Sequence, residues 1–425
     1  MAIRLYLFQS AARGSAYGVG TYIRELIGAL SRAEKDMEIW LVHLYSEKKE
    51  VTVDILDGYS ALFIPSPSIS AQYVKPQERS SYYYDSVVHL LRLYIQPHDQ
   101  VIFHLNFLQE IQMADRLKEF FGGQVVITLH YQDWGFTLQG NRTRFERVIG
   151  SEKSLLTDKK ELSVFESFQQ EIILFEKADA IIALSTFTMD LLFRHYPSVQ
   201  HKKYLVYNGF RSETKGIPSK AFKARLRRKW HITLSEKVIL FVGRLDEIKG
   251  LNYAIAAFRL LHNKMPGVRL IVAGEGDFQA SLKESFTLGT KITFTGRVDW
   301  ETLSELYSLA DVGIMPSTHE QCSYVAIEMM AHGLPLVVTG STGLAEMIVD
   351  GSTGYVVPVL EKETGVEISA ERLAESLIEI LNNPFRKARM SANVRQRFLS
   401  LYTAERMGGA TLSVYKSLYQ TTSFY

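Results

Sequence analysis

Cysteine is almost missing from this sequence, since Cys322 is the only one in 425 residues. A single thiol excludes an internal disulfide and a cysteine-rich zinc site, and it is typical of a reducing compartment. Long apolar runs are missing too. None reaches the roughly eighteen residues that a membrane-spanning helix needs, and the apolar run near the N-terminus is too short for a secretion signal. We therefore expect a cytoplasmic protein.

An excess of charge of one sign is also missing. The 48 basic side chains nearly balance the 46 acidic ones, and the formal net charge is +2. Because a dedicated nucleic-acid-binding protein carries a strong positive field, no nucleic-acid partner is expected. The basic run RLRRK, Arg225 to Lys229, is interpreted as the solvated face of a helix. The 22 tyrosines and 23 phenylalanines leave room for an aromatic patch that touches a membrane surface.

The sequence does contain a regular alternation of short apolar runs and longer helical patterns, which is typical of a parallel α/β sheet. The alternation stops at the polar stretch RSETKGIPSK and then starts again. With 425 residues the chain can bury two cores, so we predict two Rossmann-like lobes, 1–210 and 211–400, and a terminal segment, 401–425. Ligands of such sheets bind beyond the carboxyl ends of the strands, where unusual side chains are therefore informative.

One group of unusual side chains follows the first apolar run of the second half. In FVGRLDEIKG, residues 241–250, Arg244 and Lys249 flank a turn between a strand and a helix. A diphosphate needs cations to replace its lost hydration, and a guanidinium fork beside an ammonium group supplies them. Unpaired N–H groups at the helix start add to the attraction. Two basic residues in a loop are more often merely solvated, so this prediction depends on a second group.

That second group lies in STHEQCSYVAIEMMAHGLP, residues 317–335. Ser323 is a candidate N-cap for a helix from Tyr324 to His332. Glu320 then precedes the helix and Glu328 lies on its second turn, so the two carboxylates occupy different levels of one site. Carboxylates accept sugar hydroxyls and the helix start attracts an anion, which fits a ribose, a pyranose and a phosphate. The alternative is that Glu328 faces solvent on an amphipathic helix.

These residues resemble the group 1 glycosyltransferases, also called glycosyltransferase family 4. That family has the GT-B fold, two Rossmann-like lobes facing a cleft, and retains the anomeric configuration. Weaker matches in the first half are SAYGVGTYIRELIGAL, TLH, ADAIIALSTFT and YNGF, and YTAERMGGATLSVYKSL is similar to the family's last helices, which cross back onto the first lobe. The strong matches are, in order, VGRLDEIKG, LIVAGEGD, ITFTGRVDWETLSELYSLADVGIMPS, the Glu320 to Glu328 spacing, MMAHGLPLVVT and STGLAEMIVDGSTGYVV.

The resemblance implies that the first lobe binds an acceptor and the second a nucleotide-diphosphate sugar, UDP- or GDP-linked, with no cofactor. It also assigns roles to individual residues. Four are implied to be catalytic: His130, beside the sugar and leaving group; Glu320, on the transferred sugar; and Arg244 and Lys249, on the phosphates. The other donor contacts implied are Gly18 near the phosphates, Glu328 on the ribose, and the backbone of Val298 at the base and of Cys322, Ser323 and Tyr324 at the sugar or phosphate.

Two departures from the family pattern leave the donor sugar open. Tyr17-Gly18 stands where the family has paired glycines, and Glu320-Gln-Cys-Ser stands where it has Glu-Gly-Phe-Gly. Bulkier residues in both loops narrow the sugar site. No Asp-x-Asp occurs, so no metal is expected on the diphosphate.

The acceptor is open as well, and a lipid carrier, a glycan, a small molecule and a peptide are all compatible with the sequence. The charged segment from Tyr131 to Glu171, a mobile flap or a helical insertion, offers Trp134 and Phe136 as aromatic contacts for it.

Two other functions are compatible with the same residues. One is a GT-B enzyme that epimerises or hydrolyses a nucleotide sugar without an acceptor, and the other is a catalytically silent binding subunit. A dehydrogenase is disfavoured, because the glycine pair Gly274 and Gly276 lacks the third glycine of the dinucleotide fingerprint.

Overall fold

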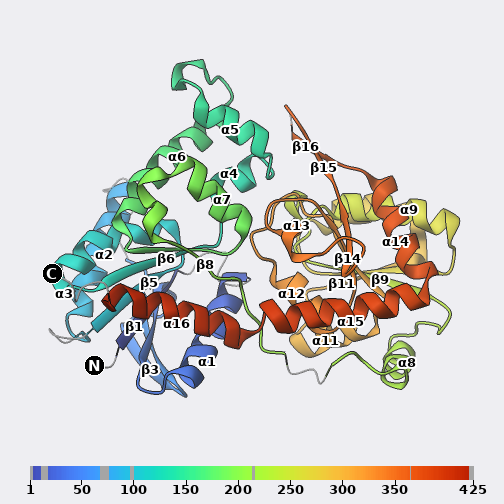
Figure 1. Cartoon of the computed structure of the whole chain (residues 1–425), viewed down its shortest axis with the longest axis horizontal. Coiled ribbons are helices and arrows are strands. Elements are labelled where there is room, and N and C mark those ends of the chain that lie inside the picture. Colours follow the sequence, from blue (N-terminus) through green and yellow to red (C-terminus); the bar gives the residue numbers. More distant parts are fainter. Residues whose placement is uncertain are drawn as a thin grey trace. The chain divides into compact units, whose positions relative to one another are not determined.

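A computed structural model describes residues 3–10, 18–67, 76–95, 100–212, 216–363 and 365–420 (Figure 1). Its contacts divide the chain into two compact units. The first contains residues 1–132, 166–211 and 404–425, and the second contains residues 133–165 and 212–403. One boundary, between Arg211 and Ser212, falls inside the polar stretch that separates the two halves of the sequence.

A sheet of eight strands forms the centre of the first unit, in the order β3-β4-β2-β1-β5-β6-β7-β8. Only β3 and β4 pair antiparallel. Leu5 to Phe8 of the central strand are fully buried on both faces, which is why its sequence is almost entirely apolar. The strands are β1 (Ile3–Ser10), β2 (Glu38–Ser46), β3 (Thr52–Leu56), β4 (Tyr59–Pro65), β5 (Gln100–Leu105), β6 (Gln124–Leu129), β7 (Ala180–Ala183) and β8 (Lys203–Leu205).

The terminal helix of the chain belongs to the first unit, where it packs on the first helix. Gly408 of α16 lies against Ala29 of α1, and Lys416 Nζ donates to Glu34 Oε2 at 2.6 Å. The helices of this unit are α1 (Gly18–Ala33), α2 (Pro76–Leu91), η2 (Leu108–Met113), α3 (Ala114–Phe121), α7 (Thr186–His195), η4 (Pro197–Lys202) and α16 (Ala404–Gln420), and α6 (Lys159–Lys177) begins in the second unit and ends in the first.

The second unit is built on a fully parallel six-stranded sheet, in the order β11-β10-β9-β12-β13-β14, with a separate hairpin of β15 and β16. Apolar residues of β9, β10, β12 and α9 form one buried core with α14. The strands are β9 (Lys237–Val242), β10 (Val268–Ala273), β11 (Ile292–Gly296), β12 (Val312–Met315), β13 (Leu336–Thr339), β14 (Gly354–Val357), β15 (Val359–Lys362) and β16 (Gly365–Ile368).

Several helices of the second unit begin at a residue whose side chain accepts a backbone hydrogen bond. Asp299, Ser369 and Asn383 cap α11, α14 and α15 in this way, so the sequence itself marks these starts. The helices are α4 (Asp133–Thr137), α5 (Arg142–Gly150), η3 (Lys153–Leu155), α8 (Lys220–Lys229), η5 (Glu247–Lys249), α9 (Leu251–Lys264), α10 (Phe278–Ser285), η6 (Phe286–Lys291), α11 (Trp300–Leu309), α12 (Tyr324–Ala331), α13 (Leu344–Met347), α14 (Ala370–Asn382) and α15 (Pro384–Leu401).

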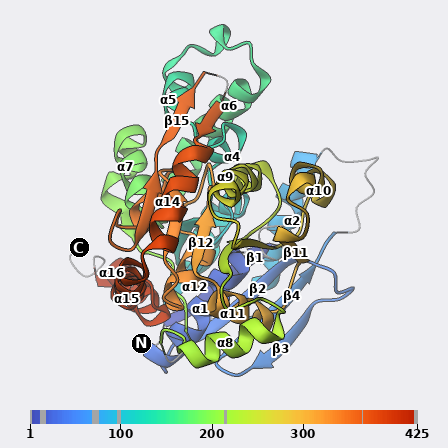
Figure 2. The same ribbon diagram turned by 90° about the vertical axis from the view of Figure 1, so that its right-hand side faces the viewer.

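The prediction of two Rossmann-like lobes is confirmed, but the chain divides differently from the lobe limits 1–210, 211–400 and 401–425. Residues 133–165, placed in the first lobe from the sequence, group with the second unit. The terminal helix groups with the first unit, as its resemblance to the family's last helices implies. The charged segment is a helical insertion, in which α4, α5 and the start of α6 lie together in both views (Figures 1 and 2). Its contacts with distant residues could not be deduced from its own composition.

Adjacent glycines test the packing of α16 on α1. A Cβ atom on Gly408 would lie 2.6 Å from the Cβ of Ala29, whereas one on Gly409 would meet nothing within 4 Å. Gly409→Ala should stabilise the protein by about 0.5–1 kcal/mol through helix propensity. Gly408→Ala gains the same stabilisation from helix propensity, but its methyl group overpacks the contact with Ala29 at a cost of about 1–3 kcal/mol. Its net effect should therefore be destabilising.

Urea unfolding of both variants measures the difference. Equal stabilities for Gly408→Ala and Gly409→Ala would contradict the helix contact.

Candidate functional site

The turn after β9 is organised by one carboxylate. Asp246 caps η5, and its Oδ1 accepts from the backbone N–H of Lys249 at 3.2 Å. Its other oxygen lies 3.0 Å from a guanidinium nitrogen of Arg244. Asp246 therefore ties together the two basic residues that the sequence singles out, at the carboxyl end of a parallel strand.

Lys249 connects this turn to the loop after β12. Its Nζ lies 2.6 Å from Glu320 Oε1, which also accepts from Ser317 Oγ at 3.1 Å. The loop is held in turn by Thr342, whose Oγ1 accepts from the backbone N–H of Glu320 at 2.9 Å. The side chains of Lys249 and Glu320 are only 22% and 11% exposed, so each charge needs the other in place of lost hydration.

Helix α12 begins at Tyr324 as predicted, and Ser323 occupies its N-cap position. The Ser323 side chain caps no backbone N–H, so the hydroxyl does not have the role that the sequence suggests. Glu328 is 9% exposed and accepts from Tyr307 OH at 2.6 Å. The alternative that Glu328 faces solvent is thus excluded. Burial, and then the charge of Glu328, raise the pKa of Tyr307 well above its ordinary value, so the phenol stays protonated and donates.

The remaining donor-site candidates of the second unit lie at the same edge of the sheet. Cys322 and Tyr324 are buried beside Ser323 at the start of α12. Val298 is half-buried in the turn between β11 and α11, just before the cap residue Asp299. Arg244, Lys249, Val298, Glu320 and α12 thus all follow parallel strands directly, where open α/β sheets bind ligands. Among the described residues, no group of three or more His, Cys, Asp or Glu side chains is arranged to hold a metal ion.

The two candidates of the first unit also lie at strand and helix ends. Gly18 is the first residue of α1, and its neighbour Tyr17 lies outside the described residues. His130 directly follows β6, with its Nε2 3.0 Å from Asn106 Oδ1 and its ring 4.6 Å from the ring of Tyr22. Burial lowers the pKa of His130 to about 3, so the imidazole is neutral near pH 7.

The helical insertion of residues 133–165 contacts both the site loops and the β15–β16 hairpin. Gln139 Nε2 donates to Glu247 Oε2 at 3.0 Å, and the Trp134 ring lies 5.5 Å from the ring of His319. Asn141 Nδ2 donates to the carbonyl oxygens of Lys362 and Gly365 at 2.7 and 2.9 Å. The insertion is therefore anchored beside the site loops. It contacts Glu247 and His319, which lie next to Lys249 and Glu320 in the sequence.

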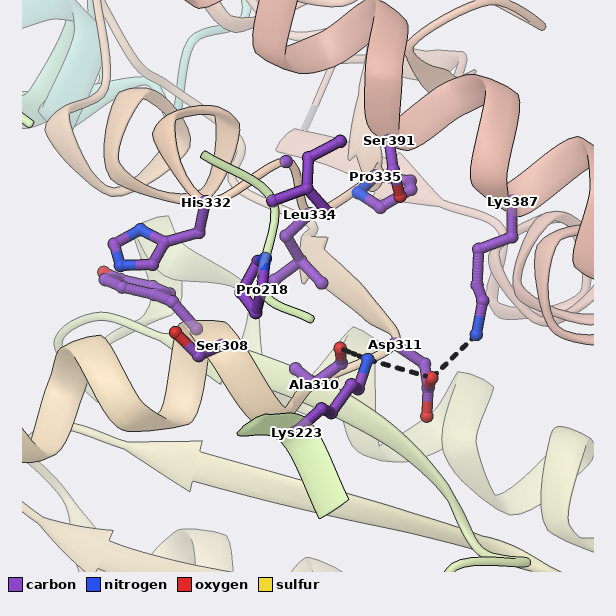
Figure 3. A pocket seen from close by; sticks show the side chains of 13 residues that line it. Pro218, Lys223, Ser308, Ala310, Asp311, His332, Leu334, Pro335, Lys387 and Ser391 are labelled. Atoms are coloured by element: carbon purple, nitrogen blue, oxygen red, sulfur yellow. Dashed lines mark hydrogen bonds and ion pairs between the residues drawn. The ribbon is translucent and has the colours of Figure 1, made fainter. Parts of the chain in front are cut away.

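A cavity with charged and apolar lining residues lies at the amino end of β12, whereas Glu320 follows its carboxyl end. It is lined by Lys223, Lys387 and Asp311, and Asp311 is 4% exposed (Figure 3). Burial alone would raise the pKa of Asp311, but the cations of Lys223, Lys387 and Arg227 hold it well below its usual range. Arg227 is 6% exposed and 2.5 Å from Asp311, so the interpretation of RLRRK as a wholly solvated face is wrong for this residue.

Four important residues were not singled out from the sequence: Asn106, Asp246, Tyr307 and Thr342. Asn106 follows the apolar run QVIFHL, and the search at carboxyl ends of strands applies to it equally. Asp246 lies inside FVGRLDEIKG, where a cap residue is a recognisable signal. Tyr307 and Thr342 carry no local signal, because their partners Glu328 and Glu320 lie 21 and 22 positions away.

Together the fold and the site define a class: a two-unit α/β protein with a candidate ligand site at the carboxyl edge of its second sheet. Comparison with known proteins shows which family this part of the chain resembles. Residues 222–397 match the sequence profile described as "Glycosyl transferases group 1". This match lies within the second unit, whose residues 222–397 are therefore similar to the group 1 glycosyltransferases, and the two Rossmann-like units are those of the GT-B fold.

Curated relatives match this chain over part of their length. An uncharacterised glycosyltransferase of Methanocaldococcus jannaschii is 38% identical over 156 residues, which are 35% of this chain and 39% of that protein. The glycogen synthase of Mycobacterium tuberculosis is 34% identical over 185 residues, 42% of each chain. The matches thus span about two fifths of these relatives.

Solved structures resemble the chain over nearly its whole length. The sucrose-phosphate synthase of Thermosynechococcus elongatus superposes with a TM-score of 0.74 at 23% identity, covering 98% of this chain and 99% of that one. The Anabaena protein HepE, solved with UDP and glucose, has a TM-score of 0.68 at 14% identity and covers 99% of each chain. At these identities the likeness concerns the fold. Of the residues described here, no helix is both long and apolar enough to cross a membrane.

Two glycines with the same backbone conformation test the contact between the site loops. Gly250 and Gly351 have φ angles of 68° and 70°, so alanine at either position carries a left-handed cost of about 1–2 kcal/mol. A Cβ atom on Gly250 would also lie 2.1 Å from the carbonyl oxygen of Pro316, whereas one on Gly351 would meet nothing within 4 Å. Gly250→Ala should therefore cost about 1–3 kcal/mol more than Gly351→Ala in urea unfolding. Equal losses would show that the loops after β9 and β12 do not touch.

Proposed function

We propose that this protein transfers a sugar from a nucleotide-diphosphate sugar to an acceptor with retention of configuration and without a metal. The observation that carries the proposal is the ion pair of Lys249 and Glu320. It supports the proposal because a cation that would bind a diphosphate and a carboxylate that would accept sugar hydroxyls lie side by side, with Glu320 in the loop before α12. The buried carboxylate of Glu328, on the second turn of the same helix, would supply a second acceptor for hydroxyl groups.

The charges support a defined sequence of events at the donor. An arriving diphosphate competes with Glu320 for Lys249, because an anion of higher charge forms the stronger interaction with the ammonium group. Glu320 released from Lys249 is then an acceptor for the hydroxyls of the transferred sugar. Arg244, held by Asp246, adds a planar fork that matches phosphate oxygens. The backbone of Cys322, Ser323 and Tyr324 brings the positive end of α12 to the same anion.

These groups also favour the chemical step. Negative charge grows on the leaving nucleoside diphosphate as the glycosidic bond breaks, and preorganised cations and N–H groups stabilise that charge more than the ground state. Glu328 would hold the ribose and the backbone of Val298 the base. Gly18 and His130 of the first unit keep the roles that the resemblance implies, at the phosphates and at the sugar.

Nucleotide binding is the first test. Titration calorimetry with UDP and with GDP should give a dissociation constant for at least one of them. Arg244→Gln and Lys249→Gln should each weaken it about ten- to a hundredfold, which is the effect of losing one charge-assisted hydrogen bond of about 1.5–3 kcal/mol. Lys283→Gln, which removes the same charge from an exposed position of α10, should change nothing.

In Lys249→Gln the nucleotide loses the attraction of the ammonium group, and the carboxylate of Glu320 also loses its cation. The double variant Lys249→Gln/Glu320→Gln removes both charges and so measures the lost attraction alone. It should still bind the nucleotide weakly. Wild-type affinity in Lys249→Gln or in the double variant, or no binding of any nucleoside diphosphate by the wild type, would contradict the proposed donor site.

Catalysis provides the second test. Incubation with UDP-glucose or GDP-mannose and a panel of acceptors should release the nucleoside diphosphate at the same rate with and without EDTA, because the cations of Arg244 and Lys249 take the place of a metal. Proton NMR of the product should show the anomeric configuration of the donor. Loss of activity in EDTA would overturn metal independence, and an inverted product would overturn retention. Release of free sugar or an epimer from the donor alone would favour a hydrolase or epimerase.

A further inference from the structure

Asn106 lies between the backbone of one strand and the imidazole that follows another. It is the first residue after β5 and is 1% exposed. Its side-chain nitrogen Nδ2 donates to the carbonyl oxygen of Phe8 in β1 at 2.9 Å. Its side-chain oxygen Oδ1 lies 3.0 Å from Nε2 of His130. The amide therefore spans two elements of the first unit with both of its polar atoms engaged.

The two contacts fix the proton on the imidazole. The Phe8 carbonyl can only accept a hydrogen bond, so the NH2 end of the Asn106 amide must face it and the oxygen must face His130. An amide oxygen can only accept, so Nε2 of His130 must carry the ring proton. In a neutral imidazole the other nitrogen, Nδ1, then holds a lone pair and is a hydrogen-bond acceptor. Among the described residues, Nδ1 has no hydrogen-bond partner.

Asn106 is itself held by a buried carboxyl group. Oε2 of Glu110 accepts from the backbone N–H groups of Asn106 and Phe107 at 3.0 and 3.2 Å, and Oε1 accepts from Ser10 Oγ at 2.8 Å. Glu110 is fully buried, so this group closes the loop after β5 and leaves the amide little freedom to rotate. The orientation of the Asn106 side chain is thus set by the Phe8 carbonyl group, to which it donates, and by its own backbone, which Glu110 holds.

We propose that Asn106 is the positioning residue that keeps His130 in the Nε2–H tautomer, so that Nδ1 accepts a hydrogen bond from a hydroxyl group of the substrate. Phosphate oxygens of a leaving group carry no proton and cannot serve as donors to Nδ1. The hydroxyl partner rests on the proposed glycosyl transfer, whereas the tautomer does not. One test therefore examines the tautomer and a second examines the hydroxyl partner.

The tautomer is measured on the full chain without ligand. In protein labelled with 15N at histidine, two-bond proton–nitrogen correlation spectra distinguish Nε2–H from Nδ1–H, and a His130→Gln variant assigns the signal. We expect Nε2–H in the wild type and loss of that pattern in Asn106→Leu, which keeps the size but accepts no hydrogen bond. An Nδ1–H pattern in the wild type, or an unchanged pattern in Asn106→Leu, would overturn the proposal.

Tyr22→Phe is the matched control. It removes the contact of Tyr22 OH with Thr128 Oγ1, 3.1 Å long, but keeps the ring that packs on His130. It should lower the melting temperature while leaving the tautomer unchanged. A shift of the tautomer in this variant would mean that general loosening of the core, rather than Asn106, controls the imidazole.

The pH profile of kcat/KM with UDP-glucose or GDP-mannose tests the catalytic consequence. Of the neighbouring titratable groups, Tyr22 on α1 and His104 on β5 are uncharged near neutral pH, because burial raises the pKa of Tyr22 and lowers that of His104 to about 3. Burial raises the pKa of Glu110 on η2, which accepts from the backbone of Asn106, to about 7, so the wild-type profile contains its titration and is the reference for the variants. Asn106→Asp adds a carboxylate beside Nε2–H and should raise the pKa of His130 by roughly 1–3 units. Protonated Nδ1 cannot accept, so activity should be lost at a higher pH than in the wild type.

Asn106→Leu should lower kcat/KM about ten- to a hundredfold at all pH values, by analogy with metal-bound imidazoles, where loss of the orienting partner has an effect of this size. A profile of Asn106→Asp that coincides with the wild type would refute the catalytic part. A wild type that cleaves neither donor would instead count against the proposed function, and the NMR result would stand by itself.

Discussion

The ion pair of Lys249 and Glu320 is the contact on which the donor side of the second unit depends. It joins the turn after β9 to the loop after β12, at the edge where all six parallel strands present their carboxyl ends. Breaking a shielded pair leaves an unpaired charge, which is why each side chain holds its loop in place while no ligand is bound. In the proposed function an incoming anion replaces the carboxylate at Lys249. Loop structure and ligand binding would then depend on the same two charges.

Buried hydrogen bonds join separate elements inside the first unit, as the ion pair does in the second. His104 on β5 contacts Tyr415 of α16 at 2.5 Å and Thr128 of β6 at 2.7 Å, and Thr128 also contacts Tyr22 of α1. Buried polar groups are tolerated only when each has a partner, so this chain of contacts fixes the relative positions of four elements. The terminal helix is thereby connected to the core that carries His130, although it lies nearly 300 residues further along the chain than β6.

Much of the candidate site followed from local sequence. FVGRLDEIKG marks a strand, a turn and a helix start, and α12 begins at Tyr324 as predicted, although Ser323 makes no capping hydrogen bond. The lobe limits failed at residues 133–165, because the contacts of this insertion with Glu247 and the β15–β16 hairpin join residues more than 100 positions apart. Arg227 was misjudged for the same reason, since its partner Asp311 lies 84 positions away.

By itself the sequence determined the fold class and which side chains lie after the parallel strands of the second unit, because strand periodicity, helix caps and clustered charges are properties of neighbouring residues. Only the tertiary structure decided which carboxylate neutralises Lys249, that Glu328 is buried under Tyr307, and which nitrogen of His130 carries the proton. Those features arise where separate strands end side by side. The spacing of residues in the sequence does not show which distant side chains meet or which of them donates the hydrogen bond.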